Sequence, residues 1–160
     1  MDIKAFIFDM DGLLFDSERI VQRSWEIAGD ELGIPHMGDV IYHTLGMNRT
    51  GRNEYFRKYI REDFPFEEFG RLTRDNFWKI VDKEGLPLKK GAKELLAYGK
   101  SQGYKMAVAT SSSREYAMGN LIRAGIDPYF DSVICGDMVK KAKPDPEIYQ
   151  KASESLRIPP

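Results

Sequence analysis

Residues 3–15 of the 160-residue chain read IKAFIFDMDGLLF. The opening run, Ile3 to Phe8, is too apolar for a strand with one wet face and is typical of a strand buried on both faces of a parallel sheet. It ends in Asp9-Met10-Asp11-Gly12, where the glycine lets the chain turn sharply. Two carboxylates at the end of a buried strand cost free energy unless a cation meets them, and ligands of open α/β sheets bind at that edge. The stretch therefore predicts a functional site; a strand followed by an ordinary polar turn is the alternative.

The composition narrows the class of protein. The chain is long enough for one domain, or for a small core with an insertion. Its 24 Lys and Arg against 25 Asp and Glu give a formal net charge of −1, which is no argument for a nucleic-acid partner. The single cysteine, Cys135, cannot form an internal disulfide and favours a reducing compartment. With neither a signal-peptide pattern nor an apolar run of membrane-spanning length, we expect a cytoplasmic protein without a membrane partner.

The periodicity of apolar residues predicts an α/β fold with a helical insertion. Helical patterns cover 16–32, 40–45, 50–61 and 67–83, with no convincing strand among them. Strand patterns return at 104–110 and 132–135, separated and followed by helical patterns at 91–101, 112–124 and 146–156. Strands that alternate with helices form βαβ units and a parallel sheet. We expect an α/β core from 1–15 and 86–160, with a helical domain at 16–85 inserted after the first strand.

Two further stretches follow the predicted second and third strands. Thr110-Ser111-Ser112-Ser113 ends one strand and opens a helix, where hydroxyls and free N–H groups suit a phosphate; an N-cap alone is the alternative, and Ser112 and Ser113 are the weaker candidates. Lys143 lies in a proline-rich turn after the third strand. Taken alone, such a lysine is usually a surface residue, but its position brings a positive charge to the same edge of the sheet.

Together these stretches resemble the haloacid dehalogenase superfamily, in its phosphatase and β-phosphoglucomutase-like branch. DMDGLLFDSE (9–18) resembles the first motif, DxDGxLxDS; VATSS (108–112) resembles the second; and Lys143-Pro144-Asp145-Pro146 resembles the third, GKPxP, with Ala142 in place of glycine. The resemblance implies a Rossmann-like core with a helical cap inserted between the first and second motifs.

The resemblance also implies roles for individual residues. Asp9 would be the nucleophile that forms an aspartyl-phosphate, and Asp11 the general acid and base. Thr110 and Ser111 would bind the phosphate, and Lys143 would neutralise the cluster. The implied cofactor is Mg²⁺, held by the carboxylate of Asp9 and the backbone carbonyl of Asp11.

The cap bears on the choice between phosphatase and mutase. Gly46 and Arg49 resemble a substrate loop in which an arginine grips a second phosphate, although an arginine in such a turn is otherwise most often exposed to solvent. The β-phosphoglucomutases that the chain resembles carry a histidine at the position of Val21. The sequence therefore favours a phosphatase of a small phosphorylated metabolite, such as a sugar phosphate, over a β-phosphoglucomutase.

One departure from the family's pattern concerns the end of the chain. It stops at Pro160, before the strand and acidic motif that would supply the remaining Mg²⁺ ligand. We therefore expect an incomplete core, weak Mg²⁺ binding and low turnover. An unpaired first strand would favour self-association or swapping. A catalytically inactive fragment that only binds a ligand or partner is the alternative of another class.

Overall fold

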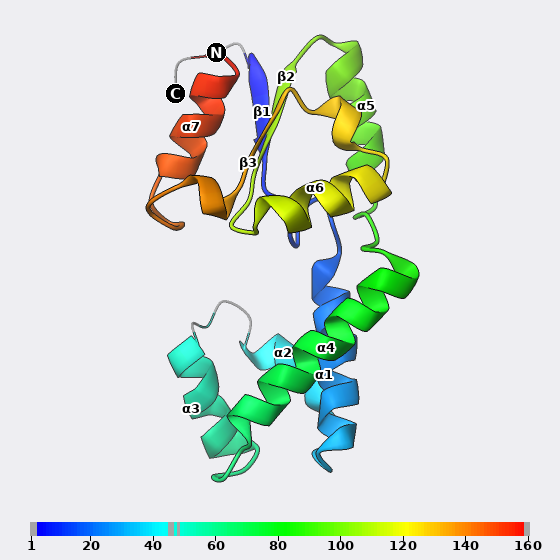
Figure 1. The fold of residues 1–160 in the computed structure, drawn as a ribbon, viewed down its shortest axis with the longest axis vertical. Coiled ribbons are helices and arrows are strands. Elements are labelled where there is room, and N and C mark those ends of the chain that lie inside the picture. The colour runs from blue at the N-terminus through cyan, green and yellow to red at the C-terminus, as the bar shows by residue number, and fades with distance from the viewer. Residues whose placement is uncertain (1–2, 45–46, 48, 159–160) are drawn as a thin grey trace. The chain divides into compact units, whose positions relative to one another are not determined.

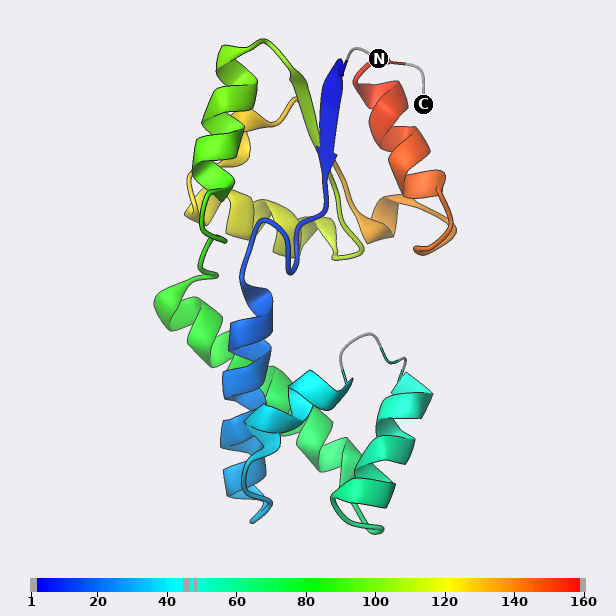
Figure 2. The ribbon, with the colours of Figure 1, turned by 180° about the vertical axis from the view of Figure 1, so that it is seen from behind.

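The computed structural model describes residues 3–44, 47 and 49–158. Contacts within the chain define two compact units: an α/β unit, Met1–Ser17 with Gly85–Pro160, and a helical unit, Glu18–Glu84. The boundaries lie within two residues of the expected limits of the helical domain, 16 and 85. Figures 1 and 2 show the elements of each unit.

The α/β unit is built on a parallel sheet of three strands in the order β1-β2-β3. The strands are β1 (Ala5–Phe8), β2 (Lys105–Ala109) and β3 (Ser132–Ile134). Helices α5 (Ala92–Ser101) and α6 (Arg114–Arg123) lie on one side of the sheet, and α7 (Glu147–Ser155) lies on the other (Figures 1 and 2). The predicted fold class, an α/β protein with a Rossmann-like parallel sheet, is confirmed.

Burial differs sharply between the central strand and β1. After Lys105, every residue of β2 is fully buried, because the strand has a neighbour on each side and helices on both faces. In β1 only Phe8 is buried, and the other three residues are half-buried. No residue of β1 is fully exposed, and β1 lies at the edge of the sheet formed by the described strands, as expected for an unpaired first strand. Self-association through this edge stays a prediction.

The helical unit holds its own aromatic core. It comprises α1 (Ser17–Glu31), α2 (Met37–Thr44), α3 (Arg49–Tyr59) and α4 (Phe66–Glu84), with Ser17, the first residue of α1, assigned to the α/β unit. Trp25 meets Phe56 and Phe69 edge-to-face, with ring centroids 5.5 and 5.6 Å apart. Such pairs contribute roughly 0.5–1.5 kcal/mol each beyond the area they bury. Three helices are thereby joined through one indole ring.

Within the described residues, none of the helices combines the length and the apolar character that a membrane crossing requires.

Candidate active site

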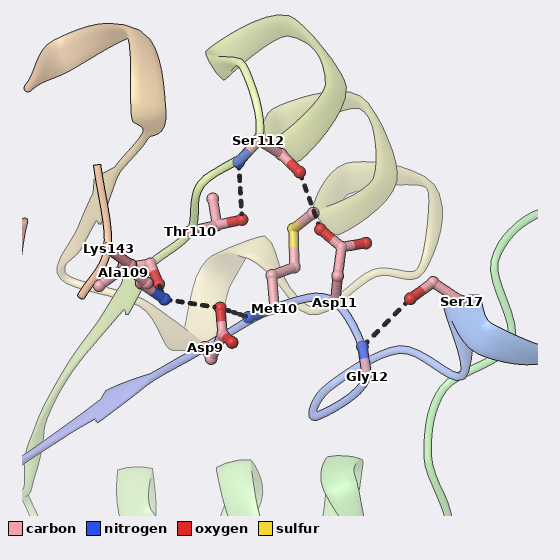
Figure 3. A network of polar contacts seen from close by, with 9 residues as sticks. All are labelled: Asp9, Met10, Asp11, Gly12, Ser17, Ala109, Thr110, Ser112 and Lys143. Carbon is pink, nitrogen blue, oxygen red and sulfur yellow. Dashed lines mark hydrogen bonds and ion pairs between the residues drawn. The ribbon is translucent and has the colours of Figure 1, made fainter. Parts of the chain in front are cut away.

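A tight turn after β1 presents the two aspartates. The carbonyl of the fully buried Met10 accepts hydrogen bonds from the N–H groups of Leu13, Leu14 and Phe15, at 3.3, 2.9 and 3.1 Å. Gly12 follows with φ of 75°, a left-handed conformation that favours glycine, and its N–H donates to Oγ of Ser17 at 3.1 Å. Since Met10 points into the core, the aspartates on either side of it are left at the carboxyl edge of the sheet (Figure 3).

Asp9 is paired with Lys143 across the ends of the strands. The Lys143 Nζ donates to Oδ1 of Asp9 and to the carbonyl of Ala109, both at 2.9 Å. The same Oδ1 accepts from the N–H of Met10 at 2.9 Å. Burial opposes the charge on Lys143, but the hydrogen bonds to Asp9 and Tyr149 outweigh it and raise the pKa of the lysine. The ammonium group therefore stays charged at neutral pH and joins the end of β1 to the end of β2.

The hydroxyl loop follows β2 directly. Thr110 is 1% exposed; its N–H donates to the carbonyl of Ile134 at 3.0 Å, and its Oγ1 accepts from the N–H of Ser112 at 3.2 Å. Ser111 is exposed, and Ser113 is the N-cap of α6, its Oγ accepting from the N–H of Tyr116 at 3.4 Å. The structure thus brings Thr110 and Lys143 to the edge of the sheet that carries Asp9, with Ser111 in the same loop as Thr110.

Asp11 is held by two residues of the loop and helix that follow β2. Ser112 Oγ donates to Oδ2 of Asp11 at 2.8 Å, and the phenol of Tyr116 donates to Oδ1 at 3.2 Å. Burial, together with the negative charge of Asp11, raises the pKa of Tyr116, so its phenol remains a donor. Sequence reasoning ranked Ser112 low and missed Tyr116. Ser112 precedes the N-cap of α6 and Tyr116 lies in its first turn, so no helical spacing joins the two in the sequence.

Gly136 packs directly against Ser111 of the hydroxyl loop, so substitution of Gly136 tests how tightly that loop is held. A Cβ at position 136 would overlap the carbonyl oxygen of Ser111, whereas a Cβ at Gly119, inside α6, meets nothing within 4 Å. We expect Gly136→Ala to destabilise the fold by about 1–3 kcal/mol through backbone displacement. Gly119→Ala is expected to stabilise it by roughly 0.5–1 kcal/mol. Urea unfolding measures both; equal stabilities would show that the loop yields freely.

The turn also offers oxygen donors to a metal ion. Among residues 3–44, 47 and 49–158, no three His, Cys, Asp or Glu side chains gather as a metal site. The Asp9 carboxylate and the Asp11 backbone carbonyl are oxygen ligands of the kind that Mg²⁺ prefers, and Mg²⁺ usually keeps several waters. Since Lys143 engages only Oδ1 of Asp9, these two donors fit a largely hydrated magnesium ion.

The structure describes little of the two cap residues that are expected to bind substrate. Gly46 lies outside the described residues. Arg49 is the first residue of α3, and its side chain likewise lies outside what the structure describes. Their role stays a prediction.

The helical unit contains a cavity that the sequence did not reveal. Its volume is about 570 Å³, and its lining comes from α1, α3 and α4: Val21, Trp25, Arg52, Asn53, Phe56, Phe66, Phe69, Gly70, Thr73, Arg74 and Phe77. The guanidinium carbon of Arg52 lies 5.8 Å from the centre of the Trp25 ring. Thr73 Oγ1 is buried without a hydrogen-bond partner among the described residues. A cavity lined by arginines and aromatic rings suits an organic anion.

The profile of the haloacid dehalogenase-like hydrolase family matches residues 3–160, nearly the whole chain. The chain belongs to this family of hydrolases. The family resemblance seen in the three motifs is therefore confirmed. The assignment agrees with the geometry, because an aspartate, a hydroxyl loop and a lysine from three separate motifs lie at one edge of the sheet.

Known proteins of similar sequence and structure extend the comparison. A phosphorylated carbohydrates phosphatase of Thermotoga maritima is 32% identical over 158 residues, which are 99% of this chain and 73% of that protein. Hexitol phosphatase A of Escherichia coli K12 is 28% identical, over 100% of this chain and 72% of its own length. The structure resembles that of a CbbY mutant of Rhodobacter sphaeroides in complex with xylulose-(1,5)bisphosphate. There the TM-score is 0.64 at 25% identity, over 99% of this chain and 75% of that one. The haloacid dehalogenase-like chain thus spans about three quarters of each of these proteins.

Proposed function

We propose that this haloacid dehalogenase-like hydrolase is a phosphatase of a small phosphorylated metabolite, such as a sugar phosphate, and acts through an aspartyl-phosphate on Asp9. The observation that carries the proposal is the contact of Lys143 with both Asp9 and the Ala109 carbonyl, immediately before the hydroxyl loop. A cation and a row of donors around one carboxylate are what a phosphoryl group requires as its charge develops. Two of the similar proteins are named as phosphatases, which supports the same reading.

The reaction proceeds in two displacements at phosphorus. In the first, a carboxylate oxygen of Asp9 forms a bond to phosphorus while the bond to the leaving oxygen breaks, and Asp11 gives that oxygen a proton. In the second, Asp11 takes a proton from the water that attacks the aspartyl-phosphate, which releases phosphate and restores Asp9. Throughout, Lys143, the hydroxyl of Thr110 and the N–H and hydroxyl groups of Ser111 balance the charge on the phosphoryl oxygens.

We also propose Mg²⁺ as the cofactor, held by the Asp9 carboxylate and the Asp11 backbone carbonyl. When bound, it supplies positive charge next to the phosphoryl oxygens. Because the described residues offer few ligands, we expect weak binding, and calorimetric titration with MgCl₂ measures it directly. A cytoplasmic location remains a proposal that rests on the single cysteine.

We propose that the cavity of the helical unit binds a small organic anion, such as a phosphorylated sugar. Its aromatic lining suits the carbon skeleton of a sugar, while Arg52 and Arg74 suit an anionic group. One of the similar structures holds a sugar bisphosphate, which supports this class of ligand.

Arg52→Gln tests this cavity. We expect the Kd for a sugar bisphosphate, measured by calorimetry, to rise about tenfold, the loss of one charge-assisted hydrogen bond. Arg61→Gln is the matched control, because Arg61 lies in the same unit, outside the cavity, and among the described residues pairs with the exposed Asp63. An unchanged Kd in Arg52→Gln would show that the cavity does not bind the anion.

The function itself is tested by a screen of phosphorylated metabolites with Mg²⁺. Release of inorganic phosphate supports the phosphatase. Interconversion of glucose 1-phosphate and glucose 6-phosphate without phosphate release would identify a β-phosphoglucomutase instead. Binding of ligand without any turnover would identify a catalytically inactive chain.

A further inference from the structure

The proposed two-step reaction needs one carboxyl group, that of Asp11, to give a proton and then to take one. We propose that Ser112 and Tyr116 are positioning residues that together hold the Asp11 carboxylate in the orientation from which it exchanges these protons. The inference rests on the proposed phosphatase function and adds two residues to it.

The geometry fixes both oxygens of the carboxylate. Oδ2 accepts from Ser112 at 2.8 Å and Oδ1 from Tyr116 at 3.2 Å, so rotation of the side chain would break at least one bond. Each carboxylate oxygen has two lone pairs, and one stays available for a proton after the bond is made. These two hydrogen bonds, from Ser112 and Tyr116, form a clamp that restrains the Asp11 carboxylate and still leaves it free to bind a proton.

The clamp is itself held by its surroundings. Ser113 caps α6, and the N–H of Arg114 donates to Oδ2 of Asp137 at 2.9 Å, which fixes the start of the helix that carries Tyr116. The Asp11 backbone lies in the turn closed by the Met10 carbonyl. The two ends of each hydrogen bond thus belong to backbone that is anchored independently.

The clamp also separates the two aspartates by role. Asp9 turns toward Lys143 and Asp11 turns toward α6 (Figure 3). Two carboxylates that share one partner raise each other's energy, and separate partners avoid this. Ser112 contacts both the hydroxyl loop and Asp11, because its N–H donates to Thr110 Oγ1 while its hydroxyl donates to the Asp11 carboxylate. A single residue therefore joins the hydroxyl loop to the carboxylate that would transfer the proton.

Tyr116→Phe removes one donor and keeps the ring. The probe is p-nitrophenyl phosphate, whose leaving group needs no proton, followed by stopped flow. In Tyr116→Phe the first step should stay fast while the second, which needs Asp11 as base, slows. We expect a burst of p-nitrophenol equal to the enzyme concentration, then a steady rate lowered about tenfold, as for the loss of one hydrogen bond to a charged group.

An alkyl phosphate gives the complementary result, since its leaving oxygen needs a proton. There the first step of Tyr116→Phe should slow as well, so that the burst is absent and kcat falls at unchanged KM. Tyr98→Phe is the matched control: it removes the same atom from an exposed position of the α/β unit. Ser112→Ala should reproduce the burst with p-nitrophenyl phosphate.

Two outcomes overturn the clamp. One is a Tyr116→Phe enzyme with wild-type kinetics. The other is a fall in burst amplitude and steady rate by the same factor, which marks a loss of folded enzyme and not of positioning. A wild-type chain that releases no p-nitrophenol would instead overturn the proposed function, and the clamp with it.

Discussion

Asp9→Asn is expected to lower phosphate release on the order of 10⁶-fold, the scale on which loss of a catalytic nucleophile acts in other covalent enzymes. The amide cannot form an acyl-phosphate, although its oxygen can still accept from the N–H of Met10 and from Lys143. The fold should therefore survive the change. Phosphate release and thermal unfolding measured on the same preparation check both statements.

The wild-type chain provides the positive counterpart. Stopped with acid during turnover, it should carry one phosphoryl group that hydroxylamine removes, and Asp9→Asn should carry none. Asp30→Asn is the control, because Asp30 is an exposed aspartate of the helical unit. A variant at Asp9 that retains a tenth of the activity would assign the nucleophile to another residue and end the proposed mechanism.

Much of the candidate site was predictable because parallel strands end at one edge. Asp9 follows β1 and Thr110 follows β2, so two short apolar runs were enough to predict their proximity. Lys143 lies several residues beyond β3; its position predicted the correct edge of the sheet, and its motif predicted that it would neutralise the cluster around Asp9. The contact is long-range, between residues 134 positions apart, and local patterns do not encode it.

Other features depend on packing that no single stretch reveals. The half-burial of β1 follows from its place at the edge of the described sheet, because an apolar run reads alike at the centre and at the edge of a sheet. The cavity of the helical unit is assembled from three helices, and its two arginines, Arg52 and Arg74, look like ordinary surface positions in the sequence. Tyr116 was missed because its partner Asp11 lies 105 positions away in the sequence.

Lys143→Met is expected to lower kcat/KM by about 10²–10³-fold, the scale of removing one electrostatic stabiliser of a transition state. The change takes away the cation beside Asp9 and leaves the carbonyl of Ala109 without this donor. Arginine should not rescue the activity, because its planar fork cannot occupy the place of a point charge between these two acceptors. Lys141→Met is the control, since Lys141 is exposed and its pair with Asp145, at 3.5 Å, is of the surface kind that contributes little.

The pH dependence of the free energy of unfolding distinguishes stabilisation by the charge of Lys143 from stabilisation by the packing of its side chain. Its pKa is raised in the folded protein, so the stability that its contacts provide is fully present below the ordinary lysine value of about 10.4. That stability is lost as pH rises through the higher, folded value, because the neutral amine no longer balances Asp9. The wild type should therefore lose stability more steeply than Lys143→Met above about pH 10.4, and the two should run parallel between pH 7 and 9. Urea unfolding across this range decides it: parallel curves at every pH would mean that Lys143 acts in the fold through packing alone.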